Sequence, residues 1–233
     1  MKSAVLILLL CAANLSVSLA QKPNVLTRSE KKNGWVLLFD GETTKGWTTP
    51  SGADVPSGWQ VVDGTLRTIK DGKGGDIITT GEYSNFELRL DYNVVFTTNS
   101  GLKYFYTKYD NGGSLGMEYQ ILDDVLAEDN EKENHLSGSL YDIFAPKKLL
   151  KKIYPPGQWN SIRVVAKGKT VEHWLNNYKI LSFTRGSKEF TDAVALSKFS
   201  KTSPAFGSID KGFILLQEHG GLVSFRNIKI KKL

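Results

Sequence analysis

Cysteine is almost absent from this chain: the 233 residues contain one, at position 11, inside an apolar N-terminal segment. The remainder therefore offers no thiolate for a metal site and cannot form a disulfide. A chain without such links depends on its hydrophobic core for stability. Since β-sandwich domains reach ~200–250 residues, the part after the leader is long enough for one domain with a sizeable core.

Several sequence motifs of enzymes are also missing. The chain has no HExxH, no phosphate-binding GxxxxGK[ST], no GxSxG and no GxGxxG after a strand. No local spacing of histidines and carboxylates demands a metal, although such side chains could still bind a divalent ion. We therefore predict no certain cofactor and leave the metal requirement open.

A concentrated stripe of basic residues is lacking as well. The formal charge of +6 comes from 30 basic and 24 acidic residues, which are scattered apart from short lysine groups. Without a stripe or a reader motif, we expect no nucleic-acid partner and interpret the charges as solvated surface.

The apolar run at the N-terminus is too short to span a bilayer. Lys2, the run Val5–Ala13 and Ser18-Leu19-Ala20 have the order of a signal peptide. We predict a signal peptide at 1–20, an extension at 21–33, one domain at 34–233, and export to the periplasm or beyond. Lipidation at Cys11 is disfavoured because Leu10, just before it, is not small. No transmembrane segment is expected in the mature chain, and the oligomeric state is not predicted.

Helical periodicity is scarce after Trp35, and short runs rich in valine, isoleucine, tyrosine and phenylalanine alternate with turn residues. This pattern predicts an all-β, two-sheet antiparallel sandwich with hairpin turns at Asp63-Gly64 and Asn176-Asn177. The expected strands are 35–39, 59–62, 65–67, 76–79, 86–95, 101–106, 117–122, 159–166, 170–175, 178–183, 212–219 and 223–230.

Two stretches break this pattern. Residues 123–137 are acidic and polar and predict a long surface loop, whereas residues 184–204 predict one short helix over an edge. Loops of this length are uncommon unless they serve as lids or binding elements.

The expected strand 212–219 carries the most informative polar residues. Leu215, Gln217 and His219 fall on one face of a strand, and Gly220-Gly221 is expected to turn the chain into a hairpin with the strand that follows. His219 is thus a candidate base beside glycines that allow close approach of a ligand, with a hydrogen-bonded structural histidine as the alternative.

Further candidates lie on the middle strands. Glu118 and Gln120 share one strand face about 7 Å apart, and a solvated outer face is the alternative interpretation. Asn99 begins a turn before Lys103, although a single lysine also marks many edge strands. Tyr141 is more often core than site in such a pattern, and four tryptophans of the domain could stack on sugars but are more often core.

Two other histidines are less constrained. His173 sits in a strand whose facing is ambiguous and is the second candidate base, while His135 lies in the acidic loop.

An ordered set of motifs closely resembles the bacterial 3-keto-disaccharide hydrolase family from about Gly34 to Leu233. Each motif alone is weak, but their order along nearly the whole mature chain is specific. They are LFDG at 38–41 with GW at 46–47, VDG at 62–64, YSNFEL at 83–88, NSG at 99–101, EYQILDD at 118–124, SLYD at 139–142, PGQWN at 156–160, EHWLN at 172–176, LLQEHG at 215–220 and FRNIKI at 225–230.

The resemblance implies a jelly-roll sandwich of the concanavalin-A-like lectin and glucanase type with a groove on its concave sheet. It further implies that Lys103, Glu118, Gln120, Gln217 and His219 could converge there. The chain departs from the family in having Glu218 where aspartate is usual, and in lacking a His-Pro-Asp run at 125–137.

The function implied is cleavage of 3-keto-glycosides by deprotonation at C2 and β-elimination, with net hydrolysis once water adds back. We expect His219 as base, Lys103 or a bound cation at the enolate oxygen, and Tyr141 as donor to the leaving oxygen. Glu118, Gln120, Gln217, Asn99 and His173 would orient an oligosaccharide or glycoside substrate. The alternatives are a non-catalytic carbohydrate-binding module and a conventional endoglucanase, which would need two carboxyl groups close together.

Overall fold

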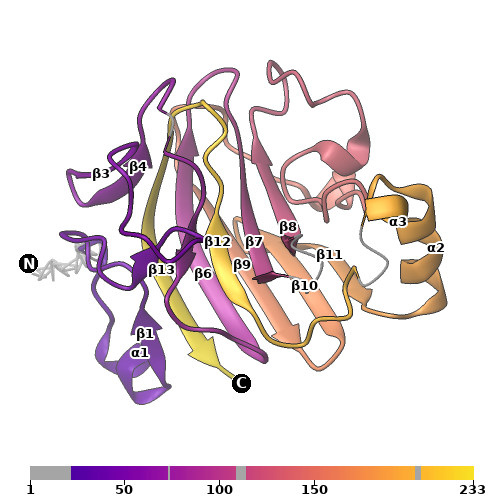
Figure 1. Ribbon diagram of the computed structural model, residues 1–233, viewed down its shortest axis with the longest axis horizontal. Coiled ribbons are helices and arrows are strands. Elements are labelled where there is room, and N and C mark those ends of the chain that lie inside the picture. The colour runs from indigo at the N-terminus through magenta and orange to yellow at the C-terminus, as the bar shows by residue number, and fades with distance from the viewer. Residues whose placement is uncertain (1–21, 73, 109–113, 203–205) are drawn as a thin grey trace, which may run out of the picture.

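The computed structural model describes residues 22–72, 74–108, 114–202 and 206–233. The expected signal peptide and Cys11 lie outside these residues. Two antiparallel sheets pack face to face and carry few helices (Figure 1), which confirms the predicted all-β sandwich.

The larger sheet has eight strands in the order β11-β10-β9-β6-β13-β4-β3, with β1 pairing to β13. Its strands are β1 (Trp35–Leu37), β3 (Trp59–Val62), β4 (Thr65–Thr68), β6 (Phe86–Val94), β9 (Asn160–Lys167), β10 (Thr170–Leu175), β11 (Tyr178–Thr184) and β13 (Val223–Lys232).

The smaller sheet has five strands in the order β2-β5-β12-β7-β8. They are β2 (Trp47–Thr48), β5 (Ile77–Thr79), β7 (Asn99–Lys108), β8 (Ser114–Leu122) and β12 (Phe213–Leu216). Of these, only the two-residue β2 had no counterpart among the expected strands.

The core lies between the sheets because side chains alternate along each strand. On β6, Phe86, Leu88, Leu90 and Tyr92 are buried, and on β8 Tyr119 and Ile121 face them from the other sheet. The residues between them point outward, so each sheet presents its polar positions on its outer face.

Two predicted hairpins are confirmed and one is wrong. Asp63-Gly64 and Asn176-Asn177 join β3 to β4 and β10 to β11, with positive φ at all four residues, as two-residue turns of this kind require. At Gly220-Gly221, by contrast, the chain crosses between sheets. β12 pairs with β5 and β7, whereas β13 pairs with β1, β4 and β6.

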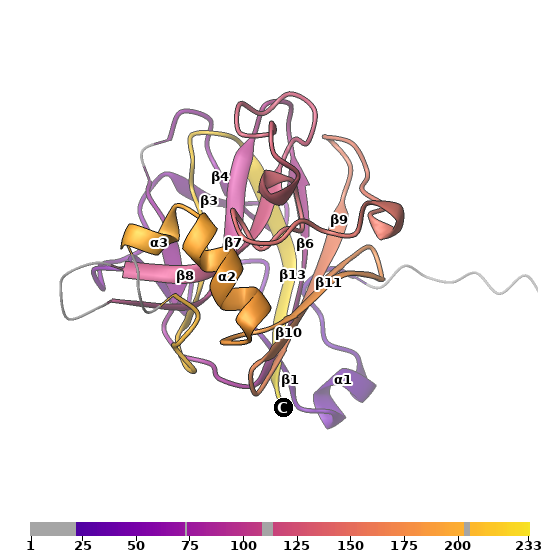
Figure 2. The same cartoon turned by 90° about the vertical axis from the view of Figure 1, so that its right-hand side faces the viewer.

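The stretch expected to hold one helix forms two, α2 (Lys188–Leu196) and α3 (Phe199–Thr202), which lie together beside β8 and β11 (Figures 1 and 2). The Ser187 hydroxyl caps α2 by accepting from the Phe190 amide at 3.2 Å. Phe190 is buried and stacks between Phe183 and Phe206, which anchors the helix to the sandwich.

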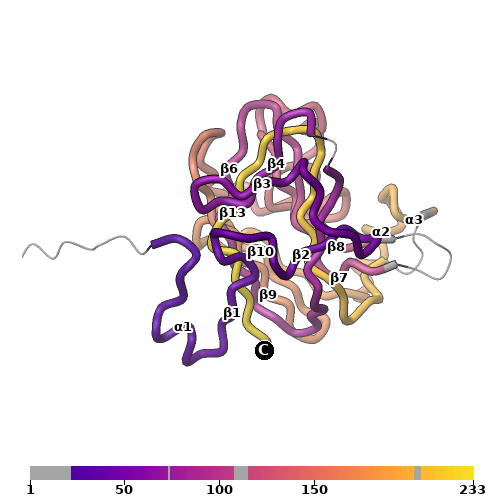
Figure 3. Tube along the Cα trace, turned by 60° about the vertical axis from the view of Figure 1, so that its left-hand side comes forward, coloured from indigo at the N-terminus to yellow at the C-terminus, as the bar shows by residue number. Residues whose placement is uncertain are grey.

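The N-terminal extension docks onto the larger sheet through α1 (Arg28–Lys32), which lies beside β1 (Figure 3). Asn24 and Asn227 exchange two amide hydrogen bonds of 2.7 and 2.8 Å, and Lys229 pairs with Glu30 at 2.5 Å. Of the helices in the described part of the chain, none is long and apolar enough to cross a membrane.

The acidic stretch at 123–137 is a loop with one short 3-10 helix, η1 (Glu133–His135). A second 3-10 helix, η2 (Lys148–Leu150), contacts β11. His135, taken from sequence as weakly constrained, is in fact buried and bonded at both ring nitrogens. The pairing carboxylates come from Asp129 and Asp142, whose proximity to His135 no local pattern revealed.

Candidate active site

A polar cleft opens on the outer face of the smaller sheet, where β7, β8 and the end of β12 meet. Leu102 and Tyr104 of β7 point into the core, so Lys103 between them points out. The same alternation on β8 turns Glu118 and Gln120 outward. Lys103 and Glu118 are partners in the β7–β8 register, and Nζ of the lysine lies 3.6 Å from Oε2 of the glutamate.

Gln217 enters the same cleft just beyond β12. Its backbone N–H donates to the Gly101 carbonyl at 2.9 Å, and its carbonyl accepts from the Ser100 hydroxyl at 2.8 Å. A Cβ at Gly101 would overlap the Glu118 carboxyl and come within 3.2 Å of Gln217 Oε1. Glycine here therefore leaves the space in which the two polar side chains meet.

His219 lies at the rim of this cleft, in the segment that connects the sheets. It is exposed, and Glu218 before it turns away and ties the segment down. The Glu218 carboxylate accepts from the backbone amides of Gly75 and Gly220. The backbone amide of Glu218 donates to Asp76 Oδ1 at 3.0 Å. Glu218 thus stabilises the loop that presents the imidazole.

Tyr141 and Asp129 form the opposite wall. The Tyr141 hydroxyl donates to Asp129 Oδ2 at 2.7 Å, and the other oxygen of Asp129 lies 2.7 Å from Nδ1 of His135. Nε2 of His135 lies 2.8 Å from Asp142 Oδ1. The ammonium of Lys198, from the link between α2 and α3, lies 4.1 Å from the centre of the Tyr141 ring.

Together these elements enclose a hollow of about 250 Å³. It is lined by Asn99, Lys103, Leu115, Gly116, Glu118, Gln120, Asp129, Tyr141, Lys198, Phe199, Gln217 and His219. Seven of the eight residues proposed from sequence are in this set.

The environment of the cleft shifts the ionisation of its acids. Burial raises the pKa of Glu118, and the positive charge of Lys103 only partly offsets this. Burial likewise raises the pKa of Asp76, which faces Lys103 and His219. Burial and the hydrogen bond to Asp129 raise the pKa of Tyr141, which keeps its phenol protonated. Ionisable groups whose pKa values are shifted in this way are typical of functional sites.

Gln120 completes the polar floor. With its amide nitrogen turned toward the available acceptors, it donates to Glu118 Oε1 at 3.2 Å and to the Ser100 carbonyl at 3.0 Å. The Glu118 carboxylate is therefore held between an ammonium and an amide, with its orientation fixed by both.

His173 is the expected site residue that the structure does not bring to the cleft. It is fully buried between the sheets, with Nδ1 3.0 Å from the Gly138 carbonyl and Nε2 2.8 Å from the Tyr104 hydroxyl. Since the carbonyl can only accept, Nδ1 carries the hydrogen and Nε2 accepts from Tyr104. The sequence left open which face of its strand carries His173. In the structure this face packs in the core, so we assign His173 no substrate contact.

Sequence reasoning missed five residues that line the cleft and one beside it: Leu115, Gly116, Asp129, Lys198, Phe199 and, beside the cleft, Asp76. Asp129, Lys198 and Phe199 belong to the two stretches that break the strand pattern, and their unusual length was the signal that could have found them. Asp76 begins an expected strand and gave no separate signal.

Within the described residues, no group of three histidine, cysteine, aspartate or glutamate side chains is arranged to hold a metal ion.

Comparison with known proteins places this geometry in context. The family model described as the 3-keto-alpha-glucoside-1,2-lyase-like domain matches residues 34–231. A 3-keto-disaccharide hydrolase of Bacteroides thetaiotaomicron is 33% identical over 86% of this chain and 79% of its own length.

Solved structures are also similar to this chain. A putative glycosyl hydrolase from Parabacteroides distasonis is 35% identical, covers 91% of this chain and all of its own, and superposes with a TM-score of 0.82. The β-porphyranase of Bacteroides plebeius shares 10% identity and a TM-score of 0.51 over 91% of this chain and 99% of its own, which reflects the fold alone. With a family model over most of its length and relatives above 30% identity, this chain belongs to the 3-keto-alpha-glucoside-1,2-lyase-like family.

Proposed function

We propose that this protein is a glycoside-cleaving enzyme that acts on 3-keto-glycosides by elimination across C1 and C2, followed by addition of water. The observation that carries the proposal is one cleft holding an exposed imidazole, an ammonium and a protonated phenol. These belong to His219, Lys103 and Tyr141. The names of the family and of its Bacteroides relative support the choice of substrate.

The first step is removal of the C2 proton by the imidazole of His219. A ketone at C3 acidifies this proton, because the electron pair of the broken C–H bond can move onto the C3 oxygen as an enolate. We assign the stabilisation of that oxygen to the positive charge of Lys103. A base near neutral pKa and a charge preorganised for the oxyanion are what such a step requires.

The second step breaks the glycosidic bond. The enolate electrons return to form the C1–C2 double bond, and the C3 carbonyl is restored. The aglycone oxygen leaves C1 with the electron pair of the C1–O bond. We assign Tyr141 as proton donor to the departing oxygen; its hydroxyl, which donates to Asp129 in the structure, turns from Asp129 to that oxygen for the transfer. Water then adds at C1 and gives its proton to Tyr141, and His219 returns its proton to C2, which yields the 3-keto sugar and the free aglycone.

The remaining polar side chains orient the sugar. Asn99, Gln120 and Gln217 carry amides that can both donate to and accept from hydroxyl groups, and Glu118 is held as an acceptor among them. A hollow of about 250 Å³ is at the small end of ligand sites, which suits one sugar ring with its aglycone outside.

A conventional retaining glycosidase is the weaker interpretation, since it needs two carboxyl groups ~5–5.5 Å apart flanking the bond. Of the residues lining the cleft, the carboxylates are Glu118 and Asp129. Asp129 already accepts from Tyr141 and lies against His135, so its oxygens are occupied.

One assay tests the proposal. The protein is incubated with an aryl glucoside and with its 3-keto counterpart, and release of the aryl alcohol is followed. Release from the ketone alone is the expected result, and release from the unoxidised glucoside would establish a conventional glycosidase instead. Release from neither, with sugar binding retained, would indicate a binding module.

The leader predicted at 1–20 leads us to propose further that the enzyme is exported and meets its substrate outside the cytoplasm. An oxidoreductase that oxidises C3 of a glycoside must supply that substrate.

A further inference from the structure

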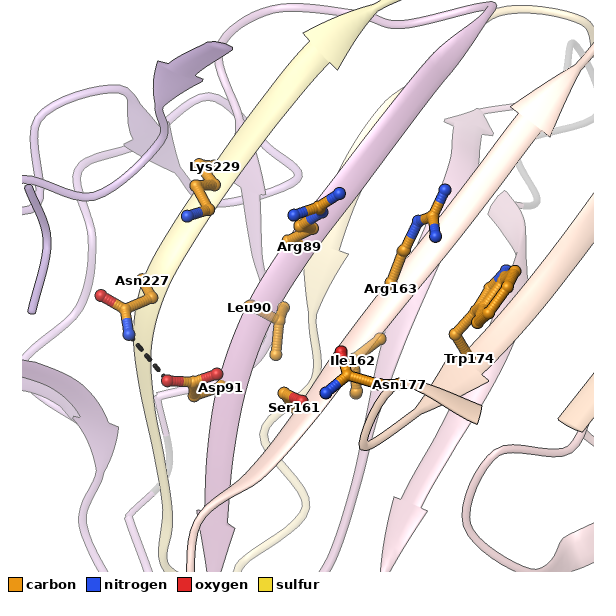
Figure 4. A pocket seen from close by; sticks show the side chains of 10 residues that line it. All are labelled: Arg89, Leu90, Asp91, Ser161, Ile162, Arg163, Trp174, Asn177, Asn227 and Lys229. Carbon is orange, nitrogen blue, oxygen red and sulfur yellow. Dashed lines mark hydrogen bonds between the residues drawn. The ribbon is translucent and has the colours of Figure 1, made fainter. Parts of the chain in front are cut away.

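A second polar trough lies on the outer face of the larger sheet, on the side of the sandwich away from the cleft. Its volume is about 400 Å³. Figure 4 shows its side chains rising from β13, β6, β9 and β10, four strands that are neighbours in the sheet. The residues that line it are Arg89, Leu90, Asp91, Ser161, Ile162, Arg163, Trp174, Asn177, Asn227 and Lys229.

Three cations stand in one row across this sheet. Lys229 is the register partner of Arg89, and Arg89 is the register partner of Arg163. Trp174 is the partner of Arg163 and ends the row. Like charges directly opposite one another destabilise a sheet. A row of three therefore opposes folding, and such a feature is expected where it serves a function.

The acids nearby neutralise this row only in part. Glu87 is buried, and Arg89, Arg163 and Lys231 all lie within 3.5 Å of its carboxylate. Burial would raise the pKa of Glu87, but its bonds to Arg89 and the charges around it hold the pKa below its ordinary value. One carboxylate thus faces three cations, and a positive charge is left over.

Three further acids share this face, and each already pairs with a cation: Asp91 with Arg226, Glu30 with Lys229 of the row, and Glu172 with Lys179. With Glu87, these four carboxylates stand among six cations, so the face keeps a surplus of positive charge.

The guanidinium of Arg163 is the group of the row best suited to bind an anion. Its Nε lies 2.7 Å from Glu87 but does not direct its hydrogen at the carboxylate, and that buried Nε has no hydrogen-bond acceptor. The plane of the guanidinium is fixed by stacking over Trp174 at 4.6 Å. A guanidinium held flat in this way, at the lining of the trough, is the group that binds carboxylates and sulfates in pairs of hydrogen bonds.

We propose that this trough binds an acidic oligosaccharide, whose carboxylate or sulfate groups sit on Arg163, Arg89 and Lys229. Four strands at ~4.8 Å spacing give the row a length of ~14 Å, which is long enough for more than one sugar. The amides of Asn177 and Asn227 and the hydroxyl of Ser161 line the floor and can bond sugar hydroxyls. The site is separate from the cleft and would tether the enzyme to an acidic glycan.

The test is affinity electrophoresis in gels containing polygalacturonate, dextran sulfate or neutral dextran. The wild-type chain is expected to be retarded by one of the two polyanions and not by neutral dextran. Retardation by polygalacturonate identifies carboxylated sugars as the ligand, and retardation by dextran sulfate identifies sulfated ones. Retardation by neither overturns the proposal.

Variants then locate the site. The double variant Arg89→Gln with Arg163→Gln is expected to weaken binding about tenfold or more, since each change removes a charge-assisted contact. The matched control, Lys188→Gln with Lys211→Gln, removes the same charge from two ion pairs outside the trough. An equal loss in both would mean unspecific attraction and would overturn the proposal. If the double variant does not fold, binding is measured on the two single variants instead. Cleavage of a short 3-keto-glucoside should be unchanged in all of these variants.

Discussion

Lys103 and Glu118 face each other across β7 and β8, with Nζ 3.6 Å from Oε2. The two residues are fifteen positions apart in the sequence, and the pair exists because β7 and β8 align in this register. The ammonium partly offsets the rise that burial causes in the pKa of the glutamate.

Replacing Lys103 by methionine should lower kcat on a 3-keto-glucoside by about 10²–10³, the usual cost of losing one oxyanion-stabilising group. Loss of the positive charge should also raise the pKa of Glu118 further, so any acid limb of the pH–rate profile that reports Glu118 should move to higher pH. The matched control is Lys211→Met, which removes a lysine paired with Glu82 outside the cleft. Unchanged kcat in K103M would show that Lys103 does not act on the enolate.

His219→Ala should reduce the rate by ~10²–10⁴, as expected for loss of a general base. Because the imidazole is exposed, the melting temperature should stay within a few degrees of the wild-type value. Release of the aglycone and deprotonation at C2 should be slowed to the same extent. Deprotonation is measured by exchange of the C2 proton in deuterium oxide. Full C2 exchange in the variant would mean that another group is the base.

Tyr141→Phe should matter more for poor leaving groups than for good ones. A nitrophenolate departs without a proton, whereas an alkoxide needs one, so loss of the phenol should slow cleavage of alkyl 3-keto-glucosides far more. The rates are compared over a series of aglycones of different pKa. A uniform decrease across the series would contradict the role of Tyr141 as proton donor. Asp129→Asn should show the same dependence in weaker form, since Asp129 acts by holding that hydroxyl.

Gly101→Ala should lower both activity and stability, because the new methyl group would overlap the Glu118 carboxyl. Displacing a packed group in this way costs ~1–3 kcal/mol in the free energy of unfolding. Gly81→Ala is the matched control, since a Cβ there meets only the Tyr83 ring and hydroxyl, at 3.6 Å or more, which is ordinary contact. Chemical denaturation and kcat measure both effects, and an active, fully stable G101A would show that the cleft is not packed as described.

Stability should fall between pH 6.5 and about 4 because of His173. Burial lowers its pKa to about 4 in the folded protein, against 6.5 when unfolded. Below pH 6.5 the unfolded chain binds the proton first, so folding loses free energy as the pH falls toward 4. The full effect is about 3 kcal/mol. Urea titrations across this range should show the slope in the wild type and a shallower one in His173→Gln. Equal slopes would mean that His173 is not the group responsible.

Much of the fold followed from local pattern. Alternation of apolar and polar residues located the strands, and the left-handed turn residues located two hairpins. The same alternation turned Lys103, Glu118 and Gln120 to one side, because side chains on a strand repeat with a period of two wherever the strand lies. The joint presence of these side chains in one cleft needed the family resemblance as well.

Other features depended on which segments meet. Gly220-Gly221 fits a hairpin turn as well as a crossover, and only the placement of β13 beside β6 decided between them. His173 could face either side of its strand until the second sheet covered it. His135 and its two carboxylates belong to irregular segments, where no periodicity tells which side chains will meet.

The sequence by itself determined the class of fold, most strand positions and the outward face of several strands, because these depend on neighbours within a few residues. Only the tertiary structure decided the pairing of distant strands, the burial of His135 and His173, and the row of cations on β13, β6 and β9. Such arrangements depend on register between segments far apart in the chain, and that register is set by the packing of the whole core.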